Sequence, residues 1–412
     1  MSEPANAFNY NIDSIRADFP ALHQDINGAP LAYLDNGAST QKPQAVIDAI
    51  TQFYSQDYAN VHRGIHSLSQ RATDQFEAAR ETVRQFINAQ AIEEIIFTSG
   101  TTDSINLIAD SFGGKFINAG DHILVSEMEH HSNIVPWQIL AERKQAHIDV
   151  IPVLGNGELN LARFHELLNS DTKIVAITQV SNALGTINPI AEITTAAHQV
   201  GAQVVLDGAQ SIAHMPVDMQ ALDCDFFVFS GHKVFAPTGI GILYGKQALL
   251  DAMPPYRSGG DMIKTVSFSG TEYNTLPYKF EAGTPHIAGA IGLAAALDYL
   301  SSIGMNNIET YESQLLAYGA EQMQSIDQLK LVGTASNKAG ILSFVIDGAH
   351  ASDLGTLLDH QGIAIRVGHH CAMPVMEKFG LDATSRASLA MYNNFDDIDR
   401  LIKALKRSIA ML

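Results

Sequence analysis

Residues 173–211, KIVAITQVSNALGTINPIAEITTAAHQVGAQVVLDGAQS, contain two short apolar runs separated by a segment with helical periodicity. The runs lie in 173–182 and 203–211, and we expect each to form a strand. Residues 190–201 between them have the apolar spacing of an amphipathic helix. Nearly continuous apolar strands that alternate with helices are typical of a parallel sheet covered on both faces. This stretch therefore predicts an α/β fold.

The same alternation extends from about residue 94 to residue 233. We predict further strands in 94–100, 122–131, 147–153 and 226–233, and helices in 101–112 and 134–146.

Beyond a long predicted helix at 283–304 the pattern changes. Predicted strands in 340–347 and 363–368 are interspersed with helices, which indicates a smaller α+β domain. We therefore expect a large domain with a mainly parallel sheet at residues 24–295, and a small domain formed by 1–23 and 296–412.

Composition limits the function classes. The chain has 412 residues, 25 basic against 44 acidic, and a net charge of -19. Nucleic acids and anionic membranes attract clusters of Lys and Arg, so this charge argues against both as partners. Two cysteines favour a reducing compartment over a disulfide framework. The N-terminal residues lack the features of a signal or transit peptide, so we expect a soluble cytoplasmic protein.

Thr98–Ser104, TSGTTDS, stands between a predicted strand and a predicted helix. Gly100 permits a tight turn, and the free N–H groups of a helix start, helped by the hydroxyls of Thr101 and Thr102, suit a phosphate. A plain helix cap is the alternative interpretation, since Ser, Thr and Asp are common there.

Asp207 and Lys233 are ionisable residues that follow strongly apolar strands. A carboxylate at the end of a buried strand is costly unless a cation pairs with it, although an N-cap is the simpler explanation for Asp207. A partly desolvated lysine has a lowered pKa and becomes a nucleophilic amine.

Taken together, these features form a phosphate cup, an acid and a nucleophilic lysine at strand ends, where open α/β sheets bind ligands. Pyridoxal 5′-phosphate needs this combination: a helix start for its phosphate, an aspartate for its ring nitrogen and a lysine for its aldehyde carbon. His130, at another predicted strand end, supplies a ring that can stack on the cofactor.

Cys371 in RVGHHCAMP, residues 366–374, admits three interpretations: metal ligand, half of a disulfide, or nucleophile. A structural zinc site needs four N or S ligands, and adjacent side chains in an extended segment point apart. Cys224 leads into an apolar strand and fits a buried core thiol better than a disulfide partner. Thiolate is the nucleophilic form of cysteine, and His369, His370 and Arg366 lie close enough in sequence to favour it.

Long, ordered motifs now identify a resemblance that covers nearly the whole chain. They include YLDNGASTQKP at 33–43, FTSGTTDSINLIA at 97–109, LDGAQSIAHMPVD at 206–218, FSGHKVFAPTGIGILYG at 229–245 and RVGHHCAMPVM at 366–376. The chain resembles the fold-type I, class-V aminotransferase group, and within it the SufS-like, group II cysteine desulfurases. One departure is DNGAST at 35–40, where relatives more often show a serine and two alanines.

The resemblance implies a role for each matching position. Lys233 would hold the cofactor covalently, Asp207 would pair with the ring nitrogen, Gln210 would bind the ring hydroxyl, and His130 would stack on the ring and move protons. Thr101, Thr102, Ser230 and His232 would bind the phosphate, with Thr284 reaching in from the second subunit of a homodimer. Asn182 and Arg386 would hold the substrate carboxylate, Arg366 and His62 would line the pocket, and Cys371 would carry a persulfide.

The implied activity is conversion of L-cysteine to L-alanine and a Cys371 persulfide. A sulfur-acceptor protein of the SufE or SufU kind would collect the sulfur, for iron–sulfur cluster assembly. Three alternatives remain open: a selenocysteine lyase, another class-V aminotransferase or lyase, and a sulfur-carrier scaffold without catalysis. We expect no metal.

Overall fold

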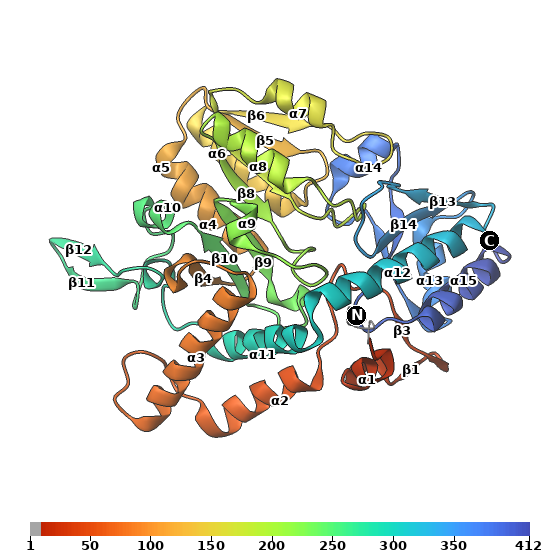
Figure 1. Cartoon of the computed structure of the whole chain (residues 1–412), viewed down its shortest axis with the longest axis horizontal. Helices are drawn as coiled ribbons and strands as arrows, with labels where there is room; N and C mark the ends of the chain where they lie inside the picture. The colour runs from red at the N-terminus through yellow and green to blue at the C-terminus, as the bar shows by residue number, and fades with distance from the viewer. Residues whose placement is uncertain (1–9) are drawn as a thin grey trace, which may run out of the picture.

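The computed structural model describes residues 10–412, and a seven-stranded sheet forms the centre of its larger part (Figure 1). Its strand order is β4-β10-β9-β8-β7-β5-β6. The strands are β4 (Ile95–Thr98), β5 (His122–Ser126), β6 (His147–Ile151), β7 (Thr172–Thr178), β8 (Gln203–Asp207), β9 (Phe226–Ser230) and β10 (Gly241–Gly245).

The opening stretch of sequence forms the predicted strand–helix–strand unit. β7 and β8 pair in parallel, with Val175 opposite Val204, and α8 (Ile190–Gln199) connects them. The pairs β5–β6, β5–β7 and β8–β9 are also parallel. β10 is antiparallel to both of its neighbours, β4 and β9. The sheet is therefore mainly parallel, as predicted.

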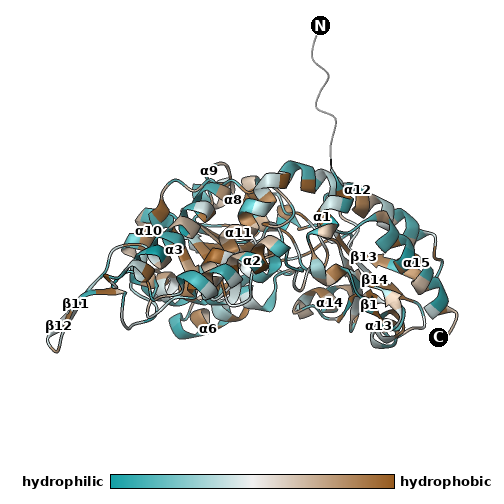
Figure 2. Cartoon of the chain, turned by 90° about the horizontal axis from the view of Figure 1, so that it is seen from below, coloured by the Kyte–Doolittle hydropathy of each residue, from teal (hydrophilic) through white to brown (hydrophobic). Residues whose placement is uncertain are grey.

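Both faces of this sheet are covered by helices, which explains why the central residues of β7, β8 and β9 are apolar and buried. One face packs against α3 (Ser67–Phe86), α8 and α11 (Ile287–Ile303), and the other against α4 (Thr101–Leu107), α6 (Val135–Lys144) and α10 (Gln247–Ala252). Neighbouring residues of one strand alternate between the two cores: Phe227 and Phe229 lie in the first, Phe226 and Val228 in the second. Figure 2 shows the hydrophobic residues gathered inside these helical layers.

A four-stranded antiparallel sheet forms the second core, in the order β13-β14-β17-β16. α12 (Met305–Gln324) leads into it from α11, and α13 (Ala351–Asp359) and α15 (Phe395–Ile409) pack against it (Figure 1). The strands are β13 (Leu329–Val332), β14 (Ile341–Ile346), β16 (Arg366–Gly368) and β17 (Thr384–Ser388).

The remaining elements are short. The helices are α1 (Ile12–Ala17), α2 (Gln44–Gln52), α5 (Gly114–Phe116), α7 (Leu161–Leu167), α9 (Met219–Leu222) and α14 (Met373–Phe379). The strands are β1 (Asp25–Ile26), β2 (Ala29–Pro30), β3 (Ala32–Tyr33), β11 (Ile263–Ser267), β12 (Gly270–Tyr273) and β15 (Ile363–Ala364).

The predicted division into domains at 24–295 and at 1–23 with 296–412 stays a prediction, and residues 1–9 lie outside the described part. β3 pairs in parallel with β15 of the C-terminal part, with Ala32 opposite Ile363. Ala32 and Leu34 belong to the same buried cluster as the four-stranded sheet. The chain therefore contacts the C-terminal core again shortly after residue 24.

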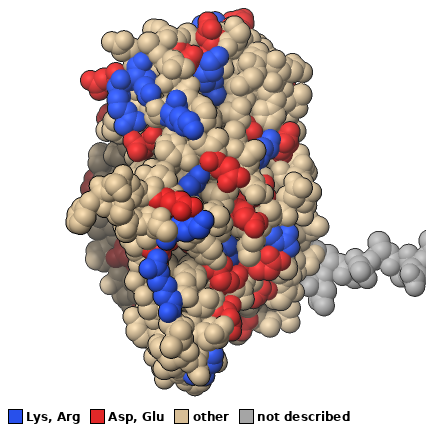
Figure 3. All heavy atoms as spheres, turned by 90° about the vertical axis from the view of Figure 1, so that its left-hand side faces the viewer, with Lys and Arg blue, Asp and Glu red and all other residues tan. Residues whose placement is uncertain are grey.

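No single helix in residues 10–412 is long and apolar enough to cross a membrane, and α11 with α12 passes that test only as a pair bent by 76°. On the face drawn in Figure 3, acidic and basic side chains are interspersed.

Candidate active site

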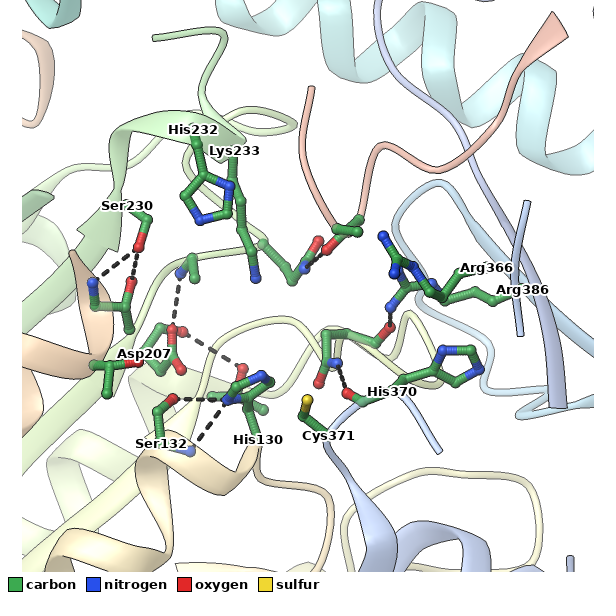
Figure 4. A pocket seen from close by; sticks show the side chains of 18 residues that line it. His130, Ser132, Asp207, Ser230, His232, Lys233, Arg366, His370, Cys371 and Arg386 are labelled. Atoms are coloured by element: carbon green, nitrogen blue, oxygen red, sulfur yellow. Dashed lines mark hydrogen bonds between the residues drawn. The ribbon is translucent and has the colours of Figure 1, made fainter. Parts of the chain in front are cut away.

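A cavity of about 290 Å³ opens where the carboxyl ends of the parallel strands meet the loops of the C-terminal part (Figure 4). It brings together residues that are as far apart in the chain as Thr101 and Arg386. Twelve of the fourteen predicted site residues line it: Thr101, Thr102, His130, Asn182, Asp207, Gln210, Ser230, His232, Lys233, Arg366, Cys371 and Arg386. Their roles stay predictions, but their meeting in one cavity is a property of the fold.

One end of the cavity combines a helix start with two hydroxyl groups. The backbone N–H of Thr101 donates to Ser230 Oγ at 2.8 Å, and the two hydroxyls are also 2.8 Å apart. α4 begins here after Gly100, which has φ +147° and no side chain that could cap the helix. A Cβ on Gly241 would lie 2.3 Å from Gly100 Cα, so both positions require glycine. The result is a set of N–H and O–H donors that suits an anion.

Lys233 and Asp207 form the floor of the cavity. Burial lowers the pKa of Lys233 to about 8, although Asp207 opposes this shift. Within residues 10–412 the Lys233 amine has no hydrogen bond or ion pair. Asp207 ends β8, and Oδ1 accepts from the Ala209 N–H at 2.9 Å, while burial raises the pKa of the carboxyl. The carboxylate thus binds the turn that follows β8 and lines the cavity, whereas no helix begins there and the N-cap interpretation was wrong.

His130 presents its ring to the cavity in a defined tautomer (Figure 4). The backbone N–H of Ser132 donates to Nδ1 at 3.1 Å, and Ser132 Oγ lies 2.8 Å from the same nitrogen. Because a backbone N–H can only donate, Nδ1 carries no proton and the neutral ring holds its proton on Nε2. Burial and the nearby Lys233 lower the pKa of His130 to about 4. The ring is therefore neutral at pH 7.

The opposite end of the cavity carries two arginines around one carboxylate. Arg366 Nη2 lies 2.7 Å from Asp35 Oδ2, and Arg386 Nη2 lies 3.6 Å from Asp35 Oδ1. Arg386 Nη1 donates to the Asn182 carbonyl at 2.8 Å. Burial lowers the pKa of Arg386 to about 10, so it stays charged at pH 7. Its Nε is buried without a hydrogen-bond partner in the described residues, and this end of the cavity thus suits a small carboxylate.

Cys371 lines the cavity at the tip of a tight turn before α14 and is exposed. Cys224 is buried in the core, as predicted, and both cysteines are free. Among residues 10–412 no group of three His, Cys, Asp or Glu residues is placed to hold a metal ion.

His370 was expected from its position beside Cys371 to favour the thiolate, and the structure does not support this role. Burial and Arg386 lower the pKa of His370 to about 3, so its ring is neutral and cannot stabilise a thiolate by charge. Nε2 lies 2.8 Å from Thr384 Oγ1, and the backbone carbonyl accepts from Asn182 Nδ2 at 2.7 Å. His370 therefore anchors the turn.

Two predicted residues lie elsewhere in the described chain. Thr284 lines a separate cavity with Arg257 and His286, and His62 lines another with Arg63 and Tyr278. His62 Nε2 is 2.8 Å from Glu77 Oε1. Neither residue reaches the Lys233 cavity within its own chain.

Several lining residues were not predicted: Gly37, Ala38, Ser132, Thr178, Ala209 and His370. Gly37 and Ala38 fall in the DNGAST segment already noted, and Ser132 stands two residues after His130. Their positions in the sequence could therefore have indicated that they line the cavity. Asp35 begins the same DNGAST segment, but its contact with Arg366 and Arg386 could not be predicted, because it joins residues more than 300 positions apart.

The Aminotransferase class-V family matches residues 32–401 of this chain. The chain belongs to the class-V aminotransferase family. Cysteine desulfurases of Escherichia coli O7:K1 and of Shigella sonnei are each 53% identical over 399 residues, which is 97% of this chain and 98% of the relative.

Solved structures of cysteine desulfurases are also similar to this chain. The cysteine desulfurase CsdA of Escherichia coli is 40% identical, with a TM-score of 0.92, and the match covers 98% of this chain and 100% of that chain. A cysteine desulfurase of Thermococcus onnurineus NA1 is 38% identical, also with a TM-score of 0.92, and covers 97% of this chain and 98% of its own. Within the class-V family the chain is a pyridoxal-phosphate-dependent cysteine desulfurase, with the fold-type I architecture that the sequence predicted.

The cavity fits pyridoxal phosphate. The donor set at Thr101 and Ser230 matches the phosphate, the buried carboxylate of Asp207 matches a ring nitrogen, and the unpaired amine of Lys233 matches the aldehyde carbon. His130 supplies a neutral ring at the cavity wall.

The lowered pKa of Lys233 gives a pH-dependent prediction for loading of the cofactor. The neutral amine is the form that condenses with an aldehyde, so loading of the apoprotein should accelerate as the pH rises to about 8 and then level off. The absorbance of the bound cofactor, followed at a series of pH values, measures this rate. A rate that keeps rising to about pH 10, the usual range for lysine, would contradict a desolvated amine.

Proposed function

We propose that this cysteine desulfurase moves the sulfur of L-cysteine onto Cys371, and that the resulting persulfide is collected by an acceptor protein. The observation that carries the proposal is the placement of the Cys371 thiol on the wall of the same cavity as the Lys233 amine and the Arg386 guanidinium. One small substrate can therefore contact a nucleophile, a base and a carboxylate-binding group at once.

The substrate carboxylate binds at the arginine end of the cavity. Arg386 offers its guanidinium donors and the Asn182 amide is adjacent, while Asp35 holds Arg366 beside them. This places the amino group toward Lys233 and the β-carbon toward Cys371.

Pyridoxal phosphate, when bound, supplies an electron sink for the α-carbon of the amino acid. Lys233 takes the α-proton. The carboxylate of Asp207 would stabilise the positive charge of the protonated ring nitrogen. Cys371 then attacks the substrate sulfur. A bond forms between the two sulfur atoms, the bond from the β-carbon to sulfur breaks with its electron pair on carbon, and a proton completes the methyl group. L-Cysteine and a thiol become L-alanine and a persulfide, with no external oxidant.

The residues proposed to bind the cofactor line the same cavity. Thr101, Thr102, Ser230 and His232 bind the phosphate, Gln210 binds the ring hydroxyl, and His130 stacks on the ring. The cavity contacts of these six residues support the assignment.

A homodimer would supply the remaining phosphate contact. Thr284 lies in a cavity separate from Lys233 of its own chain, which fits a residue that serves the second subunit. His62, near Tyr278, would line the pocket from a similar position.

We further propose a SufS-like enzyme in the cytoplasm with an acceptor of the SufE or SufU kind and a role in iron–sulfur cluster assembly. The exposed Cys371 supports transfer to another protein.

The test is a product balance. With L-cysteine and a thiol reductant, the holoenzyme should release alanine and sulfide in equal amounts. L-Selenocysteine is assayed in parallel, and a much higher rate with it would make the protein a selenocysteine lyase. Alanine without sulfide, or pyruvate in place of alanine, would overturn the proposal.

A further inference from the structure

His131, in the segment after β5, binds the turn that carries Cys371 at two points. The His131 N–H donates to the Cys371 carbonyl at 2.8 Å, and the ring Nε2 of His131 accepts from the Met373 N–H at 3.2 Å. Both groups of His131 thus bind the backbone on either side of Ala372. His131 directly follows His130, whose ring lines the cavity, so one dipeptide contacts both the candidate cofactor site and the cysteine turn.

This turn needs external support because its backbone is unfavourable. Cys371 has φ +55° and His370 has φ +53°, which is the left-handed region that non-glycine residues avoid, and Gly368 has φ +120°. Such conformations persist only where surrounding contacts hold them. The hydrogen bonds from His131 are among those contacts, together with Asn182 Nδ2 to the His370 carbonyl.

The ring of His131 must be neutral to act as an acceptor. Burial and the nearby His369 lower the pKa of His131, which favours the neutral ring at pH 7. The ring centroids of His131 and His369 are 5.6 Å apart, and His369 Nδ1 itself accepts from the Cys371 N–H at 3.1 Å.

We propose that His131 is a positioning residue that holds the Cys371 turn in place by accepting the Met373 N–H, so that the thiol faces the cavity. This inference rests on the proposed role of Cys371 as the sulfur acceptor. It concerns the turn rather than the chemistry, and it can therefore be tested separately.

The experiment compares three variants of the holoenzyme. His131→Phe keeps a ring but removes the acceptor, and His131→Gln keeps an acceptor at a similar reach. His360→Phe is the matched control, because His360 is an exposed histidine whose side chain has no hydrogen bond in the described residues. Hydrogen exchange of a peptide spanning 366–379 measures the turn directly. kcat and KM for L-cysteine, and the change in cofactor absorbance on adding L-cysteine, report on the enzyme.

In His131→Phe we expect exchange in residues 366–379 to accelerate by about fivefold, the factor for one lost hydrogen bond. kcat should fall by about tenfold to a hundredfold, while KM and the absorbance change stay as in the unaltered enzyme, because substrate binding does not need the thiol. His131→Gln and His360→Phe should retain slow exchange and kcat.

Unchanged exchange in His131→Phe would overturn the proposal, and so would equal acceleration in His131→Gln. If phenylalanine prevents folding, His131→Ala removes the acceptor without adding volume and gives the same two outcomes. A Cys371→Ala enzyme that still released sulfide would instead refute the proposed function and leave the hydrogen-exchange result valid.

Discussion

Replacement of Lys233 by alanine is expected to reduce sulfide release from L-cysteine by about 10⁴-fold or more. In the proposed mechanism Lys233 is both the amine that holds pyridoxal phosphate and the base that removes the α-proton, and no second lysine lines the cavity within residues 10–412. Sulfide release under saturating L-cysteine measures the effect. The absorbance of the covalently held cofactor should be lost as well.

Lys338→Ala is the matched control for Lys233. Burial lowers the pKa of Lys338 to about 8, as it does for Lys233, but Lys338 lines a different cavity and donates to the Gly333 carbonyl. Its replacement should leave the rate of sulfide release within a few-fold. If Lys338→Ala lost activity as fully as Lys233→Ala, burial of a lysine and not its place in the cavity would explain the result.

Replacement of Cys371 by alanine is expected to abolish sulfide release, by about 10³-fold or more, while the cofactor stays bound. In the proposed mechanism the thiol accepts the substrate sulfur, and in the described structure it has no hydrogen bond to Lys233, Thr101 or Ser230. The L-cysteine-dependent change in cofactor absorbance should therefore persist. The two readouts separate substrate binding from sulfur transfer.

Cys224→Ala controls for loss of a cysteine as such. Cys224 is fully buried, and burial raises the pKa of its thiol well above the usual range, so it is inert at pH 7. The variant should retain its rate of sulfide release, at some cost in stability from the cavity it leaves. Normal turnover in Cys371→Ala with loss in Cys224→Ala would reverse the assignment.

The parallel part of the fold could be predicted from sequence because its signal is local. Strands such as β8 and β9 have runs of three or four apolar residues, since both of their faces are buried, and polar residues stand at or just after the carboxyl end of each strand. Asp207 and Lys233 stand at two such ends. Their convergence follows from parallel pairing, which brings like ends of neighbouring strands to one edge.

Other features depend on contacts between distant residues and left no local pattern. β10 is apolar like its neighbours, and its antiparallel direction follows only from where Gly241 meets Thr98 and Ser230. The left-handed conformation of His370 and Cys371 is supported by His131 and Asn182, which follow β5 and β7, and could not be predicted from RVGHHCAMP. The separation of Thr284 from Lys233 is likewise visible only in three dimensions.

The most direct test of the account is the mass of the Cys371 peptide after a brief reaction of the holoenzyme with L-cysteine, without reductant. The account predicts one additional sulfur atom on Cys371, matched by one alanine per site, and none on Cys224. Alanine formation with Cys371 left unmodified would contradict sulfur transfer to this residue.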